Sequence, residues 1–433
     1  MTETVIPVFK ILPTTQKYDW GKIGNSSKVA QFAAASQIPG FVLDSHAPYA
    51  ELWMGTHPSS PSHLLSDVNA TLASYLAAHP QLIGEKVLNR FKSAGAAEGN
   101  LPFLFKILAI GKALSIQTHP DKATAEKLHK EQPNVYKDAN HKPEMAIALT
   151  DFTALCGFLP LPKVAAYLKS TPEFAALIPT TIVDNFIAVS TDASSSSSSA
   201  SEKAALKDLF AAVMTAEPGL FTTQLDKLIQ RYTNGGASEV ETEVKELVLT
   251  LYTQFPGDIG IWCAFMLNYV KMSPGEAIFL SAGEPHAYIS GDMVETMATS
   301  DNVIRAGLTP KLRDVPNLVN GLTYQASESS KHMIQPAPFH STQHTKLYDP
   351  PIPEFSVLLV GLKPGEKEVH PAIDGPSILI VTEGSGKLKW GAPDAVEIRK
   401  GEVVFVGAGT ELELYPWEDD ELSVYRAFVD VRG

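Results

Sequence analysis

The stretch GEAIFLSAG at residues 275–283 decides the fold, because the chain repeats it as GEVVFVGAG at residues 401–409. Gly, Glu, Phe, Ala and Gly recur at identical spacing in the two stretches. Each indicates a turn that needs Gly and Glu, a short buried strand and a second Gly turn. Such units are typical of double-sheet β-barrels, so we predict two jelly-roll or cupin-like barrels from one ancestral pattern. Chance similarity between glycine-rich turns is the alternative.

The two copies differ just after the repeat. Three residues past the final glycine, the first copy has His286 and the second has Leu412. If the first barrel holds a metal, the second is therefore predicted to have lost it.

Outside the repeat, the chain changes from β patterning to helical spacing and back. Segments rich in Ala, Leu and Lys, such as residues 203–215 and 239–255, predict an inserted helical region, and shorter helices are expected at 67–79 and 122–131. Within the insertion, the serine run at 194–199 is predicted to be a solvated loop. The fold class is thus mainly β with an inserted α-helical domain. The predicted domains are a discontinuous catalytic cupin-like barrel (1–155 and 256–325), the helical insertion (156–255) and a C-terminal cupin-like β domain without metal ligands (326–433).

Composition limits the classes of function. The chain has 433 residues, 44% of them hydrophobic, and a formal net charge of -13, which argues against nucleic-acid or acidic-membrane partners. Cys156 and Cys263 are too few for a disulfide framework and lack CxxC spacing, so a reducing compartment is expected and a metal must use N and O ligands. No targeting segment or membrane span is recognised, and we expect a cytoplasmic protein.

Polar residues of three segments form a candidate metal site. Strand alternation places Ser115, Gln117 and His119 on one face, Glu144 begins another strand, and His286 follows a proline. One amide, one carboxylate and two imidazoles suit Zn²⁺, Mn²⁺, Co²⁺ or Fe²⁺. A hydrogen-bonded strand face without metal is the alternative for Gln117 and His119.

Basic residues near these segments suggest an anionic ligand. Lys106 interrupts an apolar strand, where it either snorkels at an edge or meets an anion. Lys142 shares the strand face of Glu144. Arg305 and Lys311 form either surface salt bridges or a phosphate site, since arginine offers a planar fork and lysine a compact charge.

Long motifs in this sequence resemble a known family, type I phosphomannose isomerase. The resemblance rests on YKDANHKPE at 136–144, GEPHAY at 283–288 and SDNVIRAGLTPK at 300–311. It extends over essentially the whole chain, through YDWG at 18–21, AELWMG at 50–55, residues 102–106 and residues 114–120.

The resemblance implies a metal-bearing cupin-like barrel, an inserted helical domain and a C-terminal β domain. It implies a zinc-dependent aldose–ketose isomerase that interconverts mannose 6-phosphate and fructose 6-phosphate and supplies mannose for GDP-mannose and glycosylation. The expected partner is a small sugar phosphate. We expect a monomer, with a weak homo-oligomer as the alternative. By the resemblance, one Zn²⁺ per chain is held by Gln117, His119, Glu144 and His286.

The resemblance also implies roles for residues around the metal. Lys106, Lys142 and Arg305 match basic residues important for activity, and substrate or its phosphate is expected to contact Ser115, Tyr288, Asp301 and Lys311. We hypothesise that Glu295 is the base that carries the carbon-bound proton through a cis-enediol, with Lys142, Asp301 or a metal-bound water as alternatives. Competing functions are a non-catalytic sugar-sensing or storage bicupin, a metal-dependent cupin acting on another sugar phosphate, and an oxygenase.

Overall fold

The computed structural model describes residues 5–36, 38–191, 199–391 and 393–431. In both copies of the repeat, a strand lies between two glycine turns: β12 (Ala277–Leu280) in the first and β22 (Val403–Val406) in the second. All four turn glycines have left-handed backbone conformations that favour glycine, with φ of +86° at Gly275, +74° at Gly283, +87° at Gly401 and +73° at Gly409. The two stretches therefore repeat in structure as well as in sequence: each forms a glycine turn, a strand and a second glycine turn.

The glutamate of each copy closes its turn in the same way. A carboxylate oxygen of Glu276 accepts the backbone N–H of Ser273 at 2.7 Å, and that of Glu402 accepts the N–H of Arg399 at 2.8 Å. The Gly–Glu spacing that the two copies share thus produces the same hydrogen-bonded turn in each.

The first sheet carries the predicted metal ligands. Its main strand order is β15-β12-β9-β13-β7-β5-β2, and β8, β10, β11 and β14 branch from it. Within the described residues it has eleven strands: β2 (Thr14–Gln16), β5 (Glu51–Met54), β7 (Phe103–Ile110), β8 (Ile116–Thr118), β9 (Glu144–Ala148), β10 (Phe152–Phe158), β11 (Leu267–Met272), β12, β13 (His286–Ala298), β14 (Ile304–Gly307) and β15 (Met333–Ile334).

The second sheet combines the C-terminal strands with two N-terminal ones. Its main order is β16-β17-β18-β24-β20-β22-β1-β6. Its described strands are β1 (Val8–Leu12), β6 (His63–Leu64), β16 (Ala337–Pro338), β17 (Thr345–Tyr348), β18 (Ser356–Leu362), β19 (Glu368–His370), β20 (Ser377–Lys389), β21 (Ala395–Arg399), β22, β23 (Leu412–Pro416) and β24 (Leu422–Phe428). A separate pair joins β3 (Lys22–Ile23) to β4 (Pro48–Tyr49).

The sheets are cupin-like, as predicted, and among the described residues they do not close completely. Long strands fold each sheet over: β13 pairs with β7 and β9 in one part and with β8 and β10 in the other, and β20 likewise pairs with both β22 and β23. The main strand orders nevertheless end in edge strands, β2 and β15 in the first sheet and β6 and β16 in the second. Strand β1 pairs with β22 of the predicted C-terminal domain, and β15 pairs with β12 of the predicted catalytic domain. Each pair joins two predicted domains, and the domain boundaries stay predictions.

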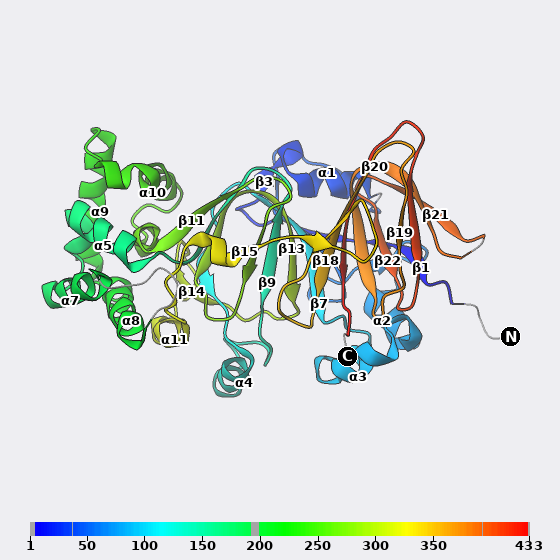
Figure 1. The fold of residues 1–433 in the computed structure, drawn as a ribbon, viewed down its shortest axis with the longest axis horizontal. Helices are drawn as coiled ribbons and strands as arrows, with labels where there is room; N and C mark the ends of the chain where they lie inside the picture. The colour runs from blue at the N-terminus through cyan, green and yellow to red at the C-terminus, as the bar shows by residue number, and fades with distance from the viewer. Residues whose placement is uncertain (1–4, 37, 192–198, 392, 432–433) are drawn as a thin grey trace.

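Helices lie at one end of the molecule and beside the sheets (Figure 1). The insertion contains α5 (Leu161–Ser170), α6 (Pro172–Ala175), α7 (Thr180–Thr191), α8 (Ala200–Met214), α9 (Pro218–Thr233) and α10 (Thr242–Gln254). The other α-helices are α1 (Lys28–Ala35), α2 (Leu72–Ala78), α3 (Glu85–Arg90), α4 (Lys122–Glu131) and α11 (Val315–Gly321). Short 3₁₀ turns are η1 (Gly24–Ser26), η2 (Pro80–Leu82), η3 (Lys92–Ala94), η4 (Ala96–Glu98), η5 (Glu239–Glu241), η6 (Ile259–Phe265) and η7 (Ser329–His332).

The helix expected at 122–131 is confirmed, whereas the one expected at 67–79 begins at Leu72 because Thr71 caps it through the N–H of Ser74. Helix α8 begins three residues before its predicted start, because Ser199 and Glu202 form a capping box. The rest of the serine run, residues 194–198, lies outside the described residues.

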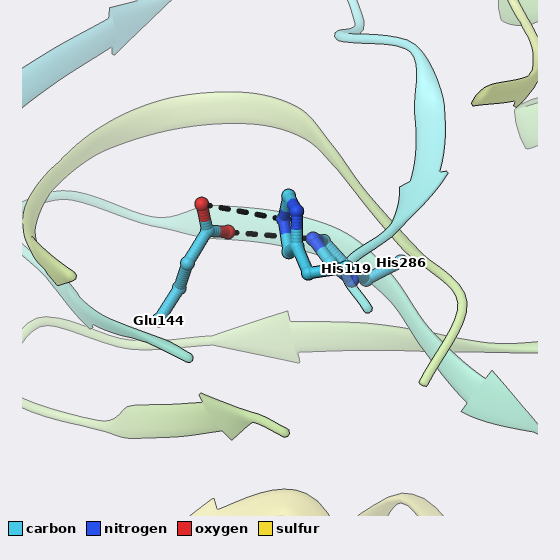
Figure 2. A group of neighbouring side chains, drawn as sticks. All are labelled: His119, Glu144 and His286. Carbon is cyan, nitrogen blue, oxygen red and sulfur yellow. Dashed lines mark ion pairs between the residues drawn. The ribbon is translucent and has the colours of Figure 1, made fainter. Parts of the chain in front are cut away.

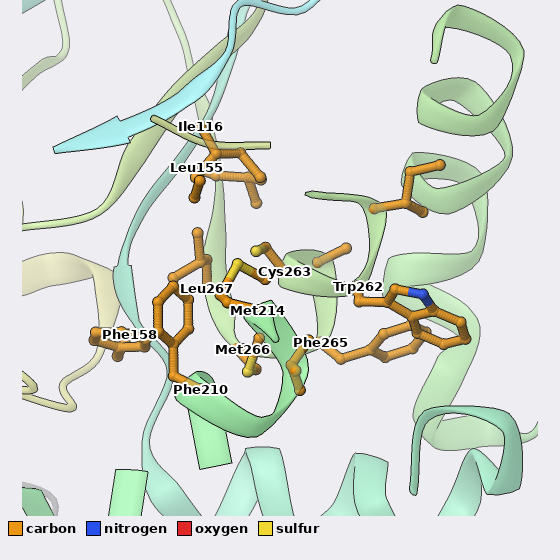
Figure 3. Packing of buried hydrophobic residues seen from close by; sticks show 14 of the residues in the cluster. Ile116, Leu155, Phe158, Phe210, Met214, Trp262, Cys263, Phe265, Met266 and Leu267 are labelled. Carbon is orange, nitrogen blue, oxygen red and sulfur yellow. The ribbon is translucent and has the colours of Figure 1, made fainter. Parts of the chain in front are cut away.

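Two apolar cores hold these parts together. One joins the helical insertion to the first sheet, with Phe158 of β10 against Phe210 of α8 and the η6 residues around Trp262 (Figure 3). The other lies between the sheets and buries Phe105 and Ile107 of the first with Phe405 of the second. Because strand residues alternate in direction, the opposite face of β7 is left for other side chains.

Candidate active site

Three neighbouring strands aim charged side chains away from the core between the sheets. In the order β9-β13-β7, the residues Met145, Val294 and Phe105 enter that core. Alternation then turns Glu144, Glu295 and Lys106 to the other face. Glu295 and Lys106 are direct cross-strand partners. The strand positions predicted from sequence therefore meet on one face of one sheet.

The two predicted histidine ligands have defined tautomers. Nδ1 of His119 lies 2.7 Å from the carbonyl oxygen of Asn302, and Nδ1 of His286 lies 2.9 Å from that of Glu284. A carbonyl can only accept, so each Nδ1 carries the proton and each Nε2 presents a lone pair. Figure 2 shows both rings beside the carboxylate of Glu144.

The arrangement fits a metal ion. One ligand atom from each of His119, Glu144 and His286 lies within 4.8 Å of the others, and all three residues are buried. The Nε2 atoms of the two histidines and Oε2 of Glu144 have no hydrogen-bond partner among the described residues. Buried polar atoms without partners are costly, whereas two imidazoles and a carboxylate suit Zn²⁺.

Gln117 lies beside this group on β8. Its Cα pairs in register with His286 on one side and with Arg305 on the other. The Ser115 hydroxyl lies 3.5 Å from the amide oxygen of Gln117, at the outer limit of a hydrogen bond. The backbone register therefore places Gln117 and Ser115 next to the candidate ligands, where sequence alternation predicted them.

Charge around the group keeps its ligands in their metal-binding forms. Burial raises the pKa of Glu144, but Lys142, at 3.0 Å from Oε1, and His119 outweigh burial and lower that pKa well below its usual range. Burial lowers the pKa of His119 to about 4, against the pull of Glu144. At neutral pH the carboxylate is thus ionised and the imidazole neutral.

A cavity of about 540 Å³ opens beside the group. Its lining includes ten of the twelve predicted site residues: Lys106, Ser115, Gln117, Lys142, Glu144, Tyr288, Glu295, Asp301, Arg305 and Lys311. The other two, His119 and His286, are 0% and 1% exposed and lie beside Glu144. The structure therefore brings all twelve together.

Lys106 has anionic partners of its own. Its ammonium lies 3.2 Å from Glu295 and 3.6 Å from Glu51, and 4.8 Å from the centre of the Trp53 ring. Burial lowers the pKa of Lys106, but the two carboxylates outweigh burial and raise it. Lys106 is 6% exposed in an inner strand, so the edge-snorkelling alternative is wrong.

Burial raises the pKa of Glu295, while Lys106 opposes this rise. The Tyr288 hydroxyl is also buried and has no hydrogen-bond partner among the described residues. These two groups, a carboxyl with a raised pKa and an unsatisfied phenol, are suited to proton transfer and hydrogen bonding with a ligand.

Three cations on the cavity wall lack an acidic partner. Among the described residues, Lys112, Arg305 and Lys311 form no side-chain ion pair, so the surface salt-bridge alternative is wrong for Arg305 and Lys311. Lys112 lies 4.3 Å from the centre of the Phe255 ring, just after α10. Unpaired cations converging on one cavity favour an anionic ligand.

Among the lining residues that sequence reasoning did not single out are Glu51, Trp53, His57 and Lys112. His57 is 5% exposed and lies 3.4 Å from Asp301. The alternation of Glu51 and Trp53 in an apolar strand was a usable signal for these two residues. His57 had no local signal, because its partner is 244 positions away in the sequence.

The chain is similar to known proteins over almost its whole length. Family models match for the phosphomannose isomerase type I catalytic domain at residues 8–161, its helical insertion domain at 178–267 and its C-terminal domain at 346–393. Mannose-6-phosphate isomerase of Cryptococcus neoformans is 48% identical, with 98% of this chain and 99% of the relative covered. That of Saccharomyces cerevisiae is 42% identical over 98% and 99%.

Solved structures are similar over the same length. A mannose 6-phosphate isomerase bound with zinc and yttrium has a TM-score of 0.79 at 26% identity, over 98% of this chain and 100% of the other. A point mutant of phosphomannose isomerase from Salmonella typhimurium has a TM-score of 0.80 with the same identity and coverage. With domain models and full-length relatives in agreement, the chain belongs to the type I phosphomannose isomerase family.

Proposed function

We propose that this protein is a zinc-dependent isomerase that interconverts D-mannose 6-phosphate and D-fructose 6-phosphate. One observation carries the proposal: a group of two histidines and one carboxylate with unsatisfied polar atoms lies beside a cavity whose wall includes three cations without an ion-pair partner among the described residues. A metal and a phosphate are the two ligands that such groups bind. The zinc-bound structural relative and the mannose-6-phosphate isomerase relatives support this choice.

Zinc held by Gln117, His119, Glu144 and His286 would act as a Lewis acid that stabilises negative charge on a substrate oxygen. Arg305, Lys311 and Lys112 would bind the phosphate, and Ser115 would donate a hydrogen bond to it. This remote binding would align the reacting carbons of the open-chain sugar.

Isomerisation moves one proton between C2 and C1 through a cis-enediol. We assign the proton carrier to Glu295, because its buried carboxyl has a raised pKa beside Lys106, as a base working near neutral pH requires. Tyr288 and Lys142 would hydrogen-bond the sugar oxygens. In the cell, the product mannose 6-phosphate would supply GDP-mannose and glycosylation.

Activity measurements with and without a chelator test the function. A coupled assay should show isomerisation of mannose 6-phosphate that is lost on chelation, restored by Zn²⁺ and independent of oxygen. Full activity of a metal-free preparation would contradict the proposal, and oxygen consumption would favour an oxygenase instead.

The base assignment has its own test in Glu295→Gln. This variant should bind zinc and substrate but turn over at least about 100-fold more slowly, the usual contribution of a positioned acid–base group. Near-normal turnover would transfer the role to Asp301, Lys142 or a metal-bound water.

No described helix combines the length and apolar character that crossing a bilayer requires. The monomeric state and the cytoplasmic location stay predictions.

A further inference from the structure

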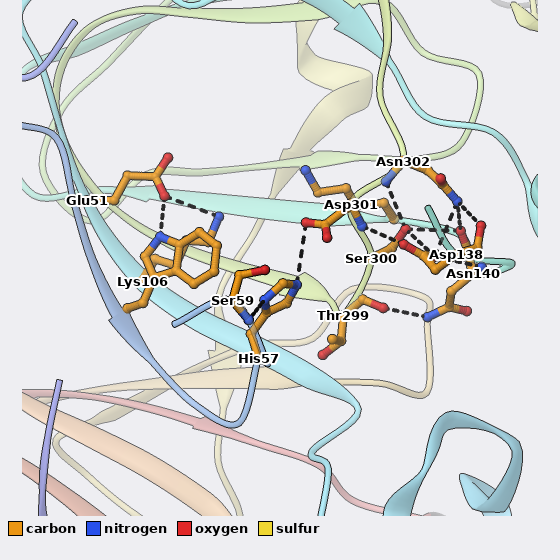
Figure 4. A network of polar contacts seen from close by, with 12 residues as sticks. Glu51, His57, Ser59, Lys106, Asp138, Asn140, Thr299, Ser300, Asp301 and Asn302 are labelled. Carbon is orange, nitrogen blue, oxygen red and sulfur yellow. Dashed lines mark hydrogen bonds and ion pairs between the residues drawn. The ribbon is translucent and has the colours of Figure 1, made fainter. Parts of the chain in front are cut away.

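His57 is a buried histidine on the cavity wall that the proposed chemistry leaves without a role. It follows β5 and packs edge-on against Trp53, with ring centroids 5.1 Å apart. Its Nε2 lies 3.4 Å from Oδ1 of Asp301, which comes from the loop after β13 (Figure 4). A buried polar ring that touches an acid in a cavity calls for a reason beyond packing.

The tautomer of His57 is determined by its own loop. The backbone N–H of Ser59 donates to Nδ1 at 3.3 Å, so Nδ1 is an acceptor. The proton of the neutral ring must then be on Nε2, the nitrogen that faces Asp301. His57 is thereby prepared as a hydrogen-bond donor to the carboxylate.

The backbone of Asp301 is held independently of His57. Its N–H donates to Asp138 at 2.7 Å, and its neighbours Ser300 and Asn302 also bond to Asp138. Asn302 additionally donates to the carbonyl of Asn140, which ties the loop to the segment that carries Lys142 and Glu144. The backbone is thus fixed, and the rotamer of the half-exposed Asp301 carboxylate remains to be set.

We propose that His57 is a positioning residue that holds the Asp301 carboxylate toward the sugar oxygens of the bound substrate. This inference rests on the proposed isomerase function. In the step it serves, an O–H bond of the sugar breaks and its proton goes to Asp301, which returns it to another oxygen of the same sugar. His57 keeps its own proton throughout, so no net charge is transferred.

The electrostatics agree with this geometry. The contact with His57 is the largest cause that lowers the pKa of Asp301, Lys142 and Lys106 lower it further, and burial opposes them. Asp301 is therefore ionised and able to accept a proton at neutral pH. Removing the His57 donor should raise the pKa of Asp301 and shift the acid limb of kcat/KM to higher pH.

A matched pair of variants tests the contact, because Gln places its amide nitrogen near the position of Nε2 and Asn near that of Nδ1. His57→Asn should lower kcat about tenfold or more, leave KM within about threefold and shift the acid limb upward. His57→Gln, which retains a donor toward Asp301, should recover most of the lost kcat and most of the shift of the acid limb. Zinc content should equal that of wild type in each, and exposed His46→Gln serves as control.

A double variant separates positioning from general structure. Asp301→Asn alone should be strongly impaired, and adding His57→Asn should cost less than about twofold more, because residues acting as a unit are not additive. Equal kcat and pH profiles in His57→Asn and wild type, or multiplying losses in the double variant, would overturn the inference. Failure of wild type to convert mannose 6-phosphate would instead overturn the proposed function.

Discussion

The two sheets contain the same strand arrangement, and their registers show what the second copy has in place of each site residue. In the first sheet, Leu280 at the end of β12 pairs with Glu144. In the second, Val406 at the end of β22 pairs with Ser377. The repeat aligns Leu280 with Val406, so Ser377 occupies the position of the metal-site carboxylate.

The histidine positions correspond in the same way. His286, the first residue of β13, pairs with Gln117. Leu412, the first residue of β23, pairs with His370. The second sheet has thus exchanged its closing histidine for leucine, while a histidine stands at the position of the glutamine.

The two sheets differ most in the partners of their buried cations, Lys106 in the first and Arg426 in the second. Glu295 pairs with Lys106 in the first sheet, and Arg426 pairs with Leu358 at the corresponding position in the second. Arg426 is 2% exposed, and no carboxylate of the described residues lies within ion-pair distance. Burial lowers its pKa.

Arg426 instead donates to Ser377 at 2.8 Å and to Nδ1 of His370 at 3.1 Å. A guanidinium therefore bonds the residues that correspond to Glu144 and Gln117 of the first sheet. The same strand arrangement thus accommodates buried polar side chains in two ways. In the first sheet their atoms are left free for a ligand, and in the second they are hydrogen-bonded to another side chain of the protein.

The largest effect should come from making the first copy like the second. His286→Leu removes one histidine of the group, and we expect loss of bound zinc and a fall in kcat of at least about 1,000-fold. Metal analysis and the coupled assay measure both.

The matched control is His370→Leu in the second sheet, which should retain zinc and most activity. Bound zinc and activity in His286→Leu would contradict the assignment of the first sheet as the metal site.

Removing the two buried cations should cost different amounts of stability. Lys106→Met leaves Glu51 and Glu295 buried without their cation and should lower the free energy of unfolding by about 3–5 kcal/mol. Arg426→Met leaves only the neutral Ser377 and His370 without a donor and should lower it by about 1–3 kcal/mol. Urea denaturation measures both.

The Lys106→Met defect should grow with pH. Since burial raises the pKa of Glu295, folding of the variant favours its protonated form, which is available below that pKa and lost above it. The variant should therefore be relatively more stable at pH 5 than at pH 8. Equal costs for the two substitutions would mean that the two cation environments are energetically equivalent.

The reverse exchange should not restore a metal site. Leu412→His places an imidazole in an apolar cluster at a fully buried position opposite His370, whose Nδ1 already accepts from Arg426, and it should cost about 1–3 kcal/mol without added zinc binding. Thermal unfolding with and without Zn²⁺ measures this. Stabilisation of the variant by Zn²⁺ would show that His370 and Ser377 can still complete a site.

The smallest effects should come from the turn glutamates. Glu402 is buried and also pairs with Lys10 at 2.6 Å, so Glu402→Gln should cost about 1 kcal/mol. Glu276 is exposed, and Glu276→Gln should cost about 0.5 kcal/mol. A larger loss for Glu276 would mean that the shared turn, rather than the Lys10 pair, dominates.

Local patterns in the sequence determined the turns, the strands and the strand faces of the candidate site. The Gly–Glu repeat specified two equivalent turns and strands. Alternation placed Gln117 with His119 on the face of one strand and Lys142 with Glu144 on the face of another, and the family motifs contain these residues. These features act over a few residues, through φ preferences, side-chain alternation and turn hydrogen bonds.

Tertiary structure alone decided that the sheets stay open, that β1 joins β22 across the whole chain, and that His57 meets Asp301. It also decided that Arg426 bonds Ser377 and His370, at the positions where the first sheet has residues of the candidate site. Each of these depends on the register between segments far apart in sequence and on which polar atoms that register buries, and no local periodicity carries this information.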